Sequence, residues 1–271
     1  MPYLEVPGAN LFYETVGVGQ VLLCITGANG SLEFFQPLAE QLKSLFTVVM
    51  YDRRGFSRSH LIGAQDYDHR IETDAGDVAA LLKHTSPDAA ATVFGNSSGA
   101  LVTLETLIRH SDLVKTVIAH EPPAHKLLPD WEQLNEGAQQ LYRIYRKQGV
   151  APALEFFAGW VKLDEHETTG LLASMDPRSG PYAFANSLYW FEREGSYGAT
   201  AFDIDALHRV KDKLVLANGE NTDKEAGHYR PNVILAEDLA LELKLLPGAH
   251  LGAVSHAKAF AEKLVAILDA R

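Results

Sequence analysis

The chain has 271 residues, of which 46% are hydrophobic and 22% are charged, which suits a globular protein with one large core. Its formal net charge of −11 provides no excess of positive charge for nucleic acid or an anionic membrane, so neither is an expected partner. The single cysteine, Cys24, excludes an internal disulfide framework and is typical of a reducing compartment. The sequence has no signal-like segment and no apolar run of membrane-spanning length, so we expect a cytoplasmic protein.

Apolar strands and amphipathic helices alternate in the N-terminal half of the chain. Residues 1–17 predict a strand, a glycine turn and a second strand. Further strands are predicted over 21–26, 46–52, 91–95 and 114–121, and helices over 33–44, 72–85 and 100–110. Short apolar strands separated by such helices indicate a mostly parallel sheet that is covered on both faces.

The alternation stops near Pro122, where a helix-like segment rich in aromatic residues begins. It resumes with a strand over 213–219, a helix over 233–240, a strand over 241–248 and a helix over 256–270. Insertions at such a position usually cover the carboxyl ends of the strands, where open α/β sheets bind ligands. We therefore expect a core of residues 1–122 and 207–271, and a helical lid of residues 123–206.

Two adjacent serines stand between the strand over 91–95 and the helix over 100–110, in the stretch Gly95-Asn96-Ser97-Ser98-Gly99. It matches Gly-x-Ser-x-Gly in one frame, which selects Ser97 over Ser98 as a nucleophile. The flanking glycines let strand and helix pack around a strained turn, and the helix N-terminus favours developing negative charge. The alternative interpretation is a tight turn with a purely structural role.

Acyl transfer also needs N–H donors for the charge that develops on the carbonyl oxygen. The N–H of Ser98, just after the nucleophile, is one expected donor. The other should come from the loop after an earlier strand, and the glycine-rich turn after residues 21–26 fits this role. We assign this second donor to Gly27 or Ala28. The alternative is a turn that simply ends the strand.

A serine nucleophile needs a base, and His250 is the expected one. It follows the final strand on a glycine-flanked loop, which puts it at the same edge of the sheet as Ser97. His256 is a weaker candidate because it opens the last helix. We expect seven further histidines to lie in polar, exposed surroundings: His60, His69, His84, His110, His166, His208 and His228.

Two loops offer the acid that would orient the base. Glu121 ends a buried strand and is followed by two prolines, which fix the chain there. Glu220 and Asp223 follow the strand over 213–219. The stretch "HEPPAH" does not have the His-Glu-x-x-His spacing of a zinc site, and its prolines prevent the helix that such a site requires. We therefore expect no metal.

The segments "ITGANG", "VVMYDRRGFSRS", "VFGNSSGAL", "VLANGEN" and "LPGAHLG" resemble, in this order, the α/β-hydrolase superfamily along nearly the whole chain. Within it, "GNSSGA" followed by "VIAHEPP" is similar to the zearalenone lactonase branch, whose acid is a glutamate after the sixth strand. The resemblance implies an α/β-hydrolase fold with a lid after that strand, and it favours Glu121 as the acid. Asn221 stands where relatives often carry an aspartate, and Asp223 and Glu220 remain as reserve acids.

The predicted function is a cofactor-independent serine hydrolase that cleaves a small, neutral carboxylic ester or lactone. Asn29, Trp160, Tyr189 and Trp190 are candidate substrate contacts, although the aromatic residues equally suit packing within the lid. Asp52 and Arg54 are predicted to brace the loop after their strand. Two alternatives remain open, namely carbon–carbon bond hydrolysis or other cofactor-free chemistry on the same residues, and a small-molecule receptor. A homodimer is compatible with the sequence.

Overall fold

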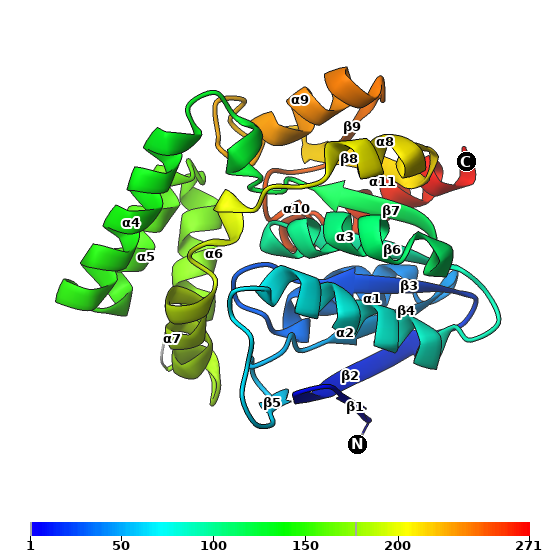
Figure 1. Ribbon diagram of the computed structural model, residues 1–271, viewed down its shortest axis with the longest axis horizontal. Helices are drawn as coiled ribbons and strands as arrows, with labels where there is room; N and C mark the ends of the chain where they lie inside the picture. Colours follow the sequence, from blue (N-terminus) through cyan, green and yellow to red (C-terminus); the bar gives the residue numbers. More distant parts are fainter. Residues whose placement is uncertain (1, 177) are drawn as a thin grey trace.

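A sheet of nine strands runs through the part of the chain that this computed structural model describes, residues 2–176 and 178–271 (Figure 1). Its order is β1-β2-β4-β3-β6-β7-β8-β9, and β5 pairs with β2 at one edge. The strands are β1 (Tyr3–Val6), β2 (Ala9–Gly17), β3 (Gln20–Ile25), β4 (Phe46–Tyr51), β5 (His60–Leu61), β6 (Ala91–Asn96), β7 (Val114–His120), β8 (Leu214–Gly219) and β9 (Leu243–Leu246). The strands from β4 to β9 along this order are parallel, which confirms the expected mostly parallel sheet.

Two hydrophobic cores lie on opposite faces of the sheet. In β3, Leu23 and Ile25 belong to one core and Leu22 and Cys24 to the other, because successive side chains of a strand point to opposite faces. One core includes side chains of α2 (Arg70–Thr85), α3 (Ser98–Arg109), α8 (Ile204–Val210) and α9 (Arg230–Leu239). The other includes side chains of α1 (Gln36–Leu42), α10 (Gly252–Ser255) and α11 (Ala257–Asp269).

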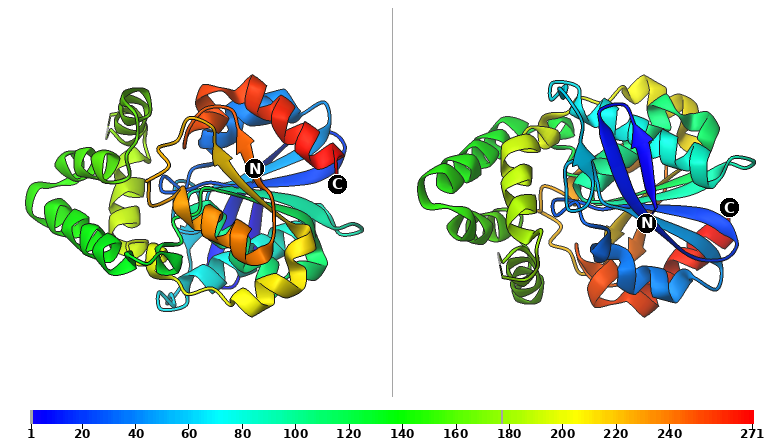
Figure 2. Two further views of the ribbon diagram at one scale, coloured as in Figure 1. Left: turned by 90° about the horizontal axis from the view of Figure 1, so that it is seen from above. Right: turned by 90° about the horizontal axis from the view of Figure 1, so that it is seen from below.

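The four helices between β7 and α8 form a separate group beyond one end of the sheet (Figures 1 and 2). They are α4 (Trp131–Gln148), α5 (Val150–Trp160), α6 (Glu165–Met175) and α7 (Ala183–Arg193). Their buried side chains, among them Leu141, Leu154 and Phe191, form a third hydrophobic cluster that also includes Phe56 of the loop after β4. Within the described residues, no helix is both long and apolar enough to cross a membrane.

Several predicted boundaries needed correction. The helix expected over 33–44 begins as a 3₁₀ turn, Leu32–Phe35, and continues as α1, whose first turn contains Pro37. The last predicted helix, 256–270, corresponds to α11, and the short helix α10 before it was not predicted. The two-residue strand β5 was not predicted, so the strand before Glu121, the sixth in the family's order, is labelled β7 here.

The parallel register brings the ends of the central strands to one edge. Ile25 pairs with Gly95, Asn96 pairs with His120, and His120 pairs with Ala217. The residues that follow β3, β6, β7 and β8 therefore meet at the same edge, on the side where α4 to α7 lie. Polar side chains far apart in the sequence are gathered there.

Candidate active site

Ser97 occupies a strained turn between β6 and α3. Its backbone has φ 57° and ψ −128°, a conformation that residues other than glycine rarely adopt. A Cβ on Gly95 would lie 2.1 Å from Thr103 Oγ1, and one on Gly99 would lie 2.2 Å from the Ile25 carbonyl oxygen. Both flanking positions thus require glycine, which confirms the steric argument made from the sequence.

Glu121 lies immediately after β7, is fully buried, and has a positive φ of 51°. Its backbone N–H donates to the Ala217 carbonyl oxygen at 3.0 Å. Its Oε1 accepts a 2.9 Å hydrogen bond from the Gly219 N–H, and its Oε2 lies 2.7 Å from His250 Nδ1. The carboxylate is therefore held on both oxygens, and one of them contacts the predicted base.

The carboxylate of Glu121 is ionised in this setting. Burial alone would raise the pKa of Glu121, but the hydrogen bond from His250 and the adjacent His228 and His120 outweigh burial, so its pKa lies below its usual value. An ionised carboxylate accepts the Nδ1 proton of His250, which assigns the other ring nitrogen, Nε2, as the free acceptor.

The two reserve acids lie elsewhere. Asp223 is exposed and forms a 3.4 Å ion pair with Lys162. Glu220 is also exposed, and its backbone N–H donates to the Leu246 carbonyl oxygen. Within the part of the chain that the structure describes, neither carboxylate contacts His250. Of the three candidate acids, Glu121 is the one that the fold brings to the predicted base.

The predicted oxyanion donors flank Ser97. Ser98 is the first residue of α3, and the first N–H groups of a helix have no intrahelical partner. A Cβ on Gly27 would lie 2.8 Å from the Cβ of Ser97 and 3.3 Å from its Oγ, so this loop passes directly beside the hydroxyl. Among the described residues, the N–H groups of Ala28 and Ser98 have no protein acceptor. Both are thus free for a ligand.

Arg53, which was not predicted from the sequence, contacts both donor segments. This fully buried guanidinium donates to the Gly27 carbonyl oxygen at 3.3 Å and to Ser98 Oγ at 3.4 Å. In a trans peptide the C=O and the next N–H point in opposite directions. The Gly27 carbonyl also accepts a 2.9 Å hydrogen bond from the Gly30 N–H, so this turn and Arg53 together direct the Ala28 N–H the other way.

Arg53 also belongs to a buried network of charges. Its Nη2 lies 2.8 Å from Asp74 Oδ2 and 2.7 Å from Oε1 of Glu194, which follows α7. Arg70 binds Asp74 at 2.9 Å, and the Tyr197 hydroxyl donates to the same carboxylate at 2.7 Å. Burial opposes ionisation of Asp74, but the two arginines prevail and lower its pKa to about 2. The network ties α7 to the loops around Ser97.

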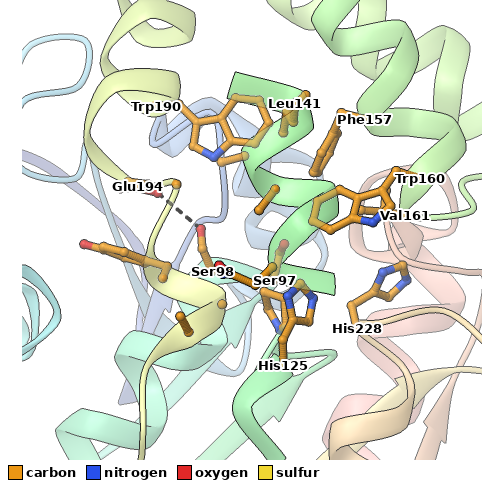
Figure 3. Close-up of a pocket in the computed structure, with 18 of the residues that line it drawn as sticks. Ser97, Ser98, His125, Leu141, Phe157, Trp160, Val161, Trp190, Glu194 and His228 are labelled. Carbon is orange, nitrogen blue, oxygen red and sulfur yellow. Dashed lines mark hydrogen bonds between the residues drawn. The ribbon is translucent and has the colours of Figure 1, made fainter. Parts of the chain in front are cut away.

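Two cavities meet at Ser97. The first, here the aromatic cavity, has a volume of about 110 Å³ (Figure 3). Its apolar lining consists mainly of Trp131, Leu141, Tyr142, Phe157, Trp160, Val161, Trp190 and Phe191. The second, here the larger cavity, has about 400 Å³, and Asn29, Glu33, His166 and Glu167 stand in its lining surface, which is mainly apolar. Ala28, Ser97, Phe157 and His250 line both, so Ser97 and the predicted base face a shared boundary.

Three of the four predicted substrate contacts line these cavities. Trp160 and Trp190 line the aromatic cavity, and Asn29 lines the larger one. Tyr189 lines neither, which corrects the prediction. One residue along a helix turns the side chain by about 100°, so Tyr189 faces away from the side that Trp190 presents. Its hydroxyl accepts a 2.6 Å hydrogen bond from Arg70, and its ring packs edge-on against Phe56.

His228 is buried, and its expected exposure was wrong. It is 3% exposed, lines the aromatic cavity, and has its ring centroid 4.0 Å from that of His250. Burial, and then the neighbouring His250, hold the pKa of His228 well below its usual value. The loop between β8 and α9 carries it to the sheet edge. Its one sequence signal was its position in the loop after a buried strand.

Comparisons with known proteins agree with this architecture. Residues 20–162 match the family described as the alpha/beta hydrolase fold. The chain is 33% identical to the uncharacterized hydrolase YraK of Bacillus subtilis, over 98% of this chain and 95% of that protein. It is 24% identical to a zearalenone hydrolase of Bionectria ochroleuca, over 95% and 93% of the two chains. An enol-lactonase from Burkholderia xenovorans has a similar structure, with a TM-score of 0.75, 20% identity, and coverage of 99% and 100%. The chain belongs to the α/β-hydrolase fold family and is a hydrolase.

Proposed function

We propose that the protein is a serine hydrolase that cleaves a small, neutral carboxylic ester or lactone through an acyl-enzyme. The observation that carries this proposal is the 2.7 Å contact between Glu121 Oε2 and His250 Nδ1, at the boundary of two cavities that Ser97 also lines. A serine, a base and a buried acid that orients the base form the constellation that activates a hydroxyl for attack on a carbonyl.

In the first step, Ser97 Oγ attacks the carbonyl carbon and His250 Nε2 accepts the hydroxyl proton. Glu121 keeps the Nδ1 proton in place and stabilises the imidazolium that forms. The free N–H groups of Ala28 and Ser98 donate hydrogen bonds to the carbonyl oxygen and stabilise the negative charge that develops on it. His250 then protonates the leaving oxygen, and the acyl group remains on Ser97.

In the second step, a water molecule gives a proton to His250 and attacks the acyl-enzyme. Collapse of this second tetrahedral intermediate releases the acid and returns the proton to Ser97. In a lactone the leaving oxygen stays tethered to the acyl group, so ring opening gives a single hydroxy acid. Both halves of a substrate need room beside Ser97, and the two adjoining cavities are consistent with this requirement.

The expected preference is for an uncharged substrate, because the aromatic cavity is lined mainly by apolar side chains. We further propose that residues 123–206 act as a lid, since α4, α5 and α7 all contribute side chains to this cavity. Likeness to a zearalenone hydrolase and an enol-lactonase supports testing lactones alongside simple esters.

The deciding experiment is intact-mass spectrometry after exposure to a fluorophosphonate, which phosphonylates activated serines. We expect a single adduct on the unmodified chain and none on Ser97→Ala. The matched control is Ser98→Ala, which removes the neighbouring hydroxyl and should leave the adduct in place. An adduct that persists in Ser97→Ala would contradict the proposal.

A panel of short-chain esters, simple lactones and 1,3-diketones then identifies the bond that is cleaved. Turnover of esters or lactones, abolished in Ser97→Ala, is the expected result. Turnover of diketones alone would overturn the assignment of the bond while leaving the nucleophile intact. Saturable binding with no turnover on any compound would instead indicate a receptor.

A further inference from the structure

Three side chains from separate loops converge beside Ser97. A carboxylate oxygen of Glu121 and one ring nitrogen each of His228 and His250 lie within 4.8 Å of one another, and all three side chains are buried. Glu121 Oε2 lies 2.7 Å from His250 Nδ1 and 3.6 Å from His228 Nε2. The proposed reaction uses Glu121 and His250 but assigns no step to His228.

The Nε2 atom of His228 is an unsatisfied polar atom. It is buried, and within residues 2–176 and 178–271 it has no hydrogen-bond partner. Its distance of 3.6 Å from Glu121 Oε2 is too long for a good hydrogen bond. A buried imidazole nitrogen without a partner is costly, and a shared cation between it and the carboxylate would satisfy both groups.

We propose that Glu121, His228 and His250 form a binding site for a zinc ion, and that the bound ion inhibits the enzyme. Two imidazole nitrogens and one carboxylate oxygen are typical zinc ligands, at about 2.0–2.2 Å from the ion. Two such ligands of a tetrahedral zinc lie about 3.4 Å apart, close to the 3.6 Å between Glu121 and His228, whereas Glu121 and His250, which are 2.7 Å apart, would have to separate by about 0.7 Å to admit the ion. The adjoining aromatic cavity, which His228 and His250 both line, leaves room for water as a fourth ligand.

Inhibition follows from the tautomer of His250. The proposed reaction requires the proton on Nδ1, bound to Glu121, and a free electron pair on Nε2. Zinc at Nδ1 needs the electron pair of that atom, so the Nδ1 proton leaves to solvent and Nε2 takes one up. The ring stays neutral and no proton is lost overall. With a proton on Nε2, His250 can no longer accept one from Ser97.

The inhibition rests on the proposed function, whereas binding of the ion does not. Binding is therefore measured first, by titrating zinc chloride into Ser97→Ala in a calorimeter. We expect one tight site per chain. Cobalt(II) in place of zinc should give visible absorption bands typical of tetrahedral nitrogen and oxygen ligation, and these bands report the site independently of any activity.

Two substitutions in the Ser97→Ala background locate the site. His228→Gln should weaken zinc binding at least about tenfold and abolish the cobalt bands. His125→Gln is the matched control, because His125 is also a buried histidine that lines the aromatic cavity but is not one of the three ligands. It should leave both signals unchanged. Equal loss in both variants, or no loss in His228→Gln, would overturn the site.

Thermal unfolding without metal shows whether each variant is folded. If His228→Gln fails to fold, the unmodified chain is crystallised with zinc instead. Anomalous scattering at the zinc absorption edge then locates the bound ion. A peak between Glu121, His228 and His250 supports the proposal, and a peak only at surface pairs such as His69 and Asp66 refutes it. Inhibition of the unmodified enzyme by zinc, reversed by a chelator, tests the consequence separately.

Discussion

The carboxylate of Glu121 and the imidazole of His250 meet at 2.7 Å although 129 residues separate them in the chain. Glu121 is held by the end of β7 and by the Gly219 N–H, whereas His250 comes from the loop between β9 and α10. A carboxylate with no exposed surface that faces an imidazole would be costly unless the two were paired. The pair is thus a property of the assembled sheet edge.

Glu121→Gln should lower kcat by about 10⁴-fold, because an amide cannot hold His250 in the required tautomer or stabilise its charged form. Asp223→Asn is the matched control, since Asp223 is an exposed partner of Lys162 and should cost little. Steady-state kinetics on an ester that the unmodified chain hydrolyses provide the measurement. A large loss in Asp223→Asn with little in Glu121→Gln would move the acid to the later loop.

Gly27→Ala should reduce kcat by about 100-fold or more, since a Cβ 2.8 Å from that of Ser97 forces the loop or the nucleophile to shift. Gly76→Ala, within α2, is the control, because nothing lies within 4 Å of its added Cβ. It should leave kcat unchanged and raise the free energy of unfolding by up to about 1 kcal/mol. Fluorophosphonate labelling rates compare the two variants directly, and equal rates would contradict the close approach of Gly27.

Arg53→Lys should lower kcat while leaving KM nearly unchanged. An ammonium keeps the charge but cannot contact Gly27, Asp74 and Glu194 together, so the Gly27 carbonyl keeps only its bond from the Gly30 N–H and the Ala28 N–H is oriented less firmly.

Arg54→Lys separates this effect from a loss of stability. Arg54 pairs with Asp77 through two hydrogen bonds and is equally buried, but neither Gly27 nor Ser98 is among its recorded partners. Both variants should lower the free energy of unfolding, measured with urea, and only Arg53→Lys should lower kcat. Equal effects on kcat would reduce Arg53 to a structural role.

The contribution of His120 and His125 to the free energy of unfolding should fall as the pH drops from about 6.5 to about 4. Burial lowers the pKa of His120 and of His125 to about 4 in the folded chain, so in this range the unfolded chain binds protons that the folded chain does not. Each histidine contributes up to about 1.4 kcal/mol per pH unit. Urea unfolding of the unmodified chain and of His125→Gln tests this, and the variant should show the shallower slope. Identical slopes would mean that His125 gains a proton as readily in the folded state.

The local patterns in the sequence predicted most of the fold correctly. Short apolar strands and amphipathic helices are set by interactions within a few residues, and both were predicted from the sequence. Ser97 could be singled out because the Gly-x-Ser-x-Gly pattern is local, although the steric demand for Gly99 comes from the Ile25 carbonyl at the end of another strand. The choice of Glu121 over Asp223 needed a family resemblance as well, since either loop could reach His250.

The residues that were missed or misjudged depend on which side chains meet in three dimensions. Arg53 and Arg54 are neighbours in the sequence, yet only Arg53 is recorded in contact with Gly27 and Ser98. Tyr189 and Trp190 are also adjacent, and helix rotation directs only Trp190 into the cavity. His228 looked like an exposed loop residue, but packing buried it against His250.

By itself, the sequence determined the alternation of strands and helices, the parallel sheet and the position of the serine, because backbone propensity and hydrophobic period act over short distances. Only the tertiary structure decided which acid faces His250, that Arg53 supports the loops around Ser97, and that His228 joins Glu121. Those contacts form where the ends of several strands meet. The number of residues between two positions in the sequence does not determine how far apart their side chains lie there.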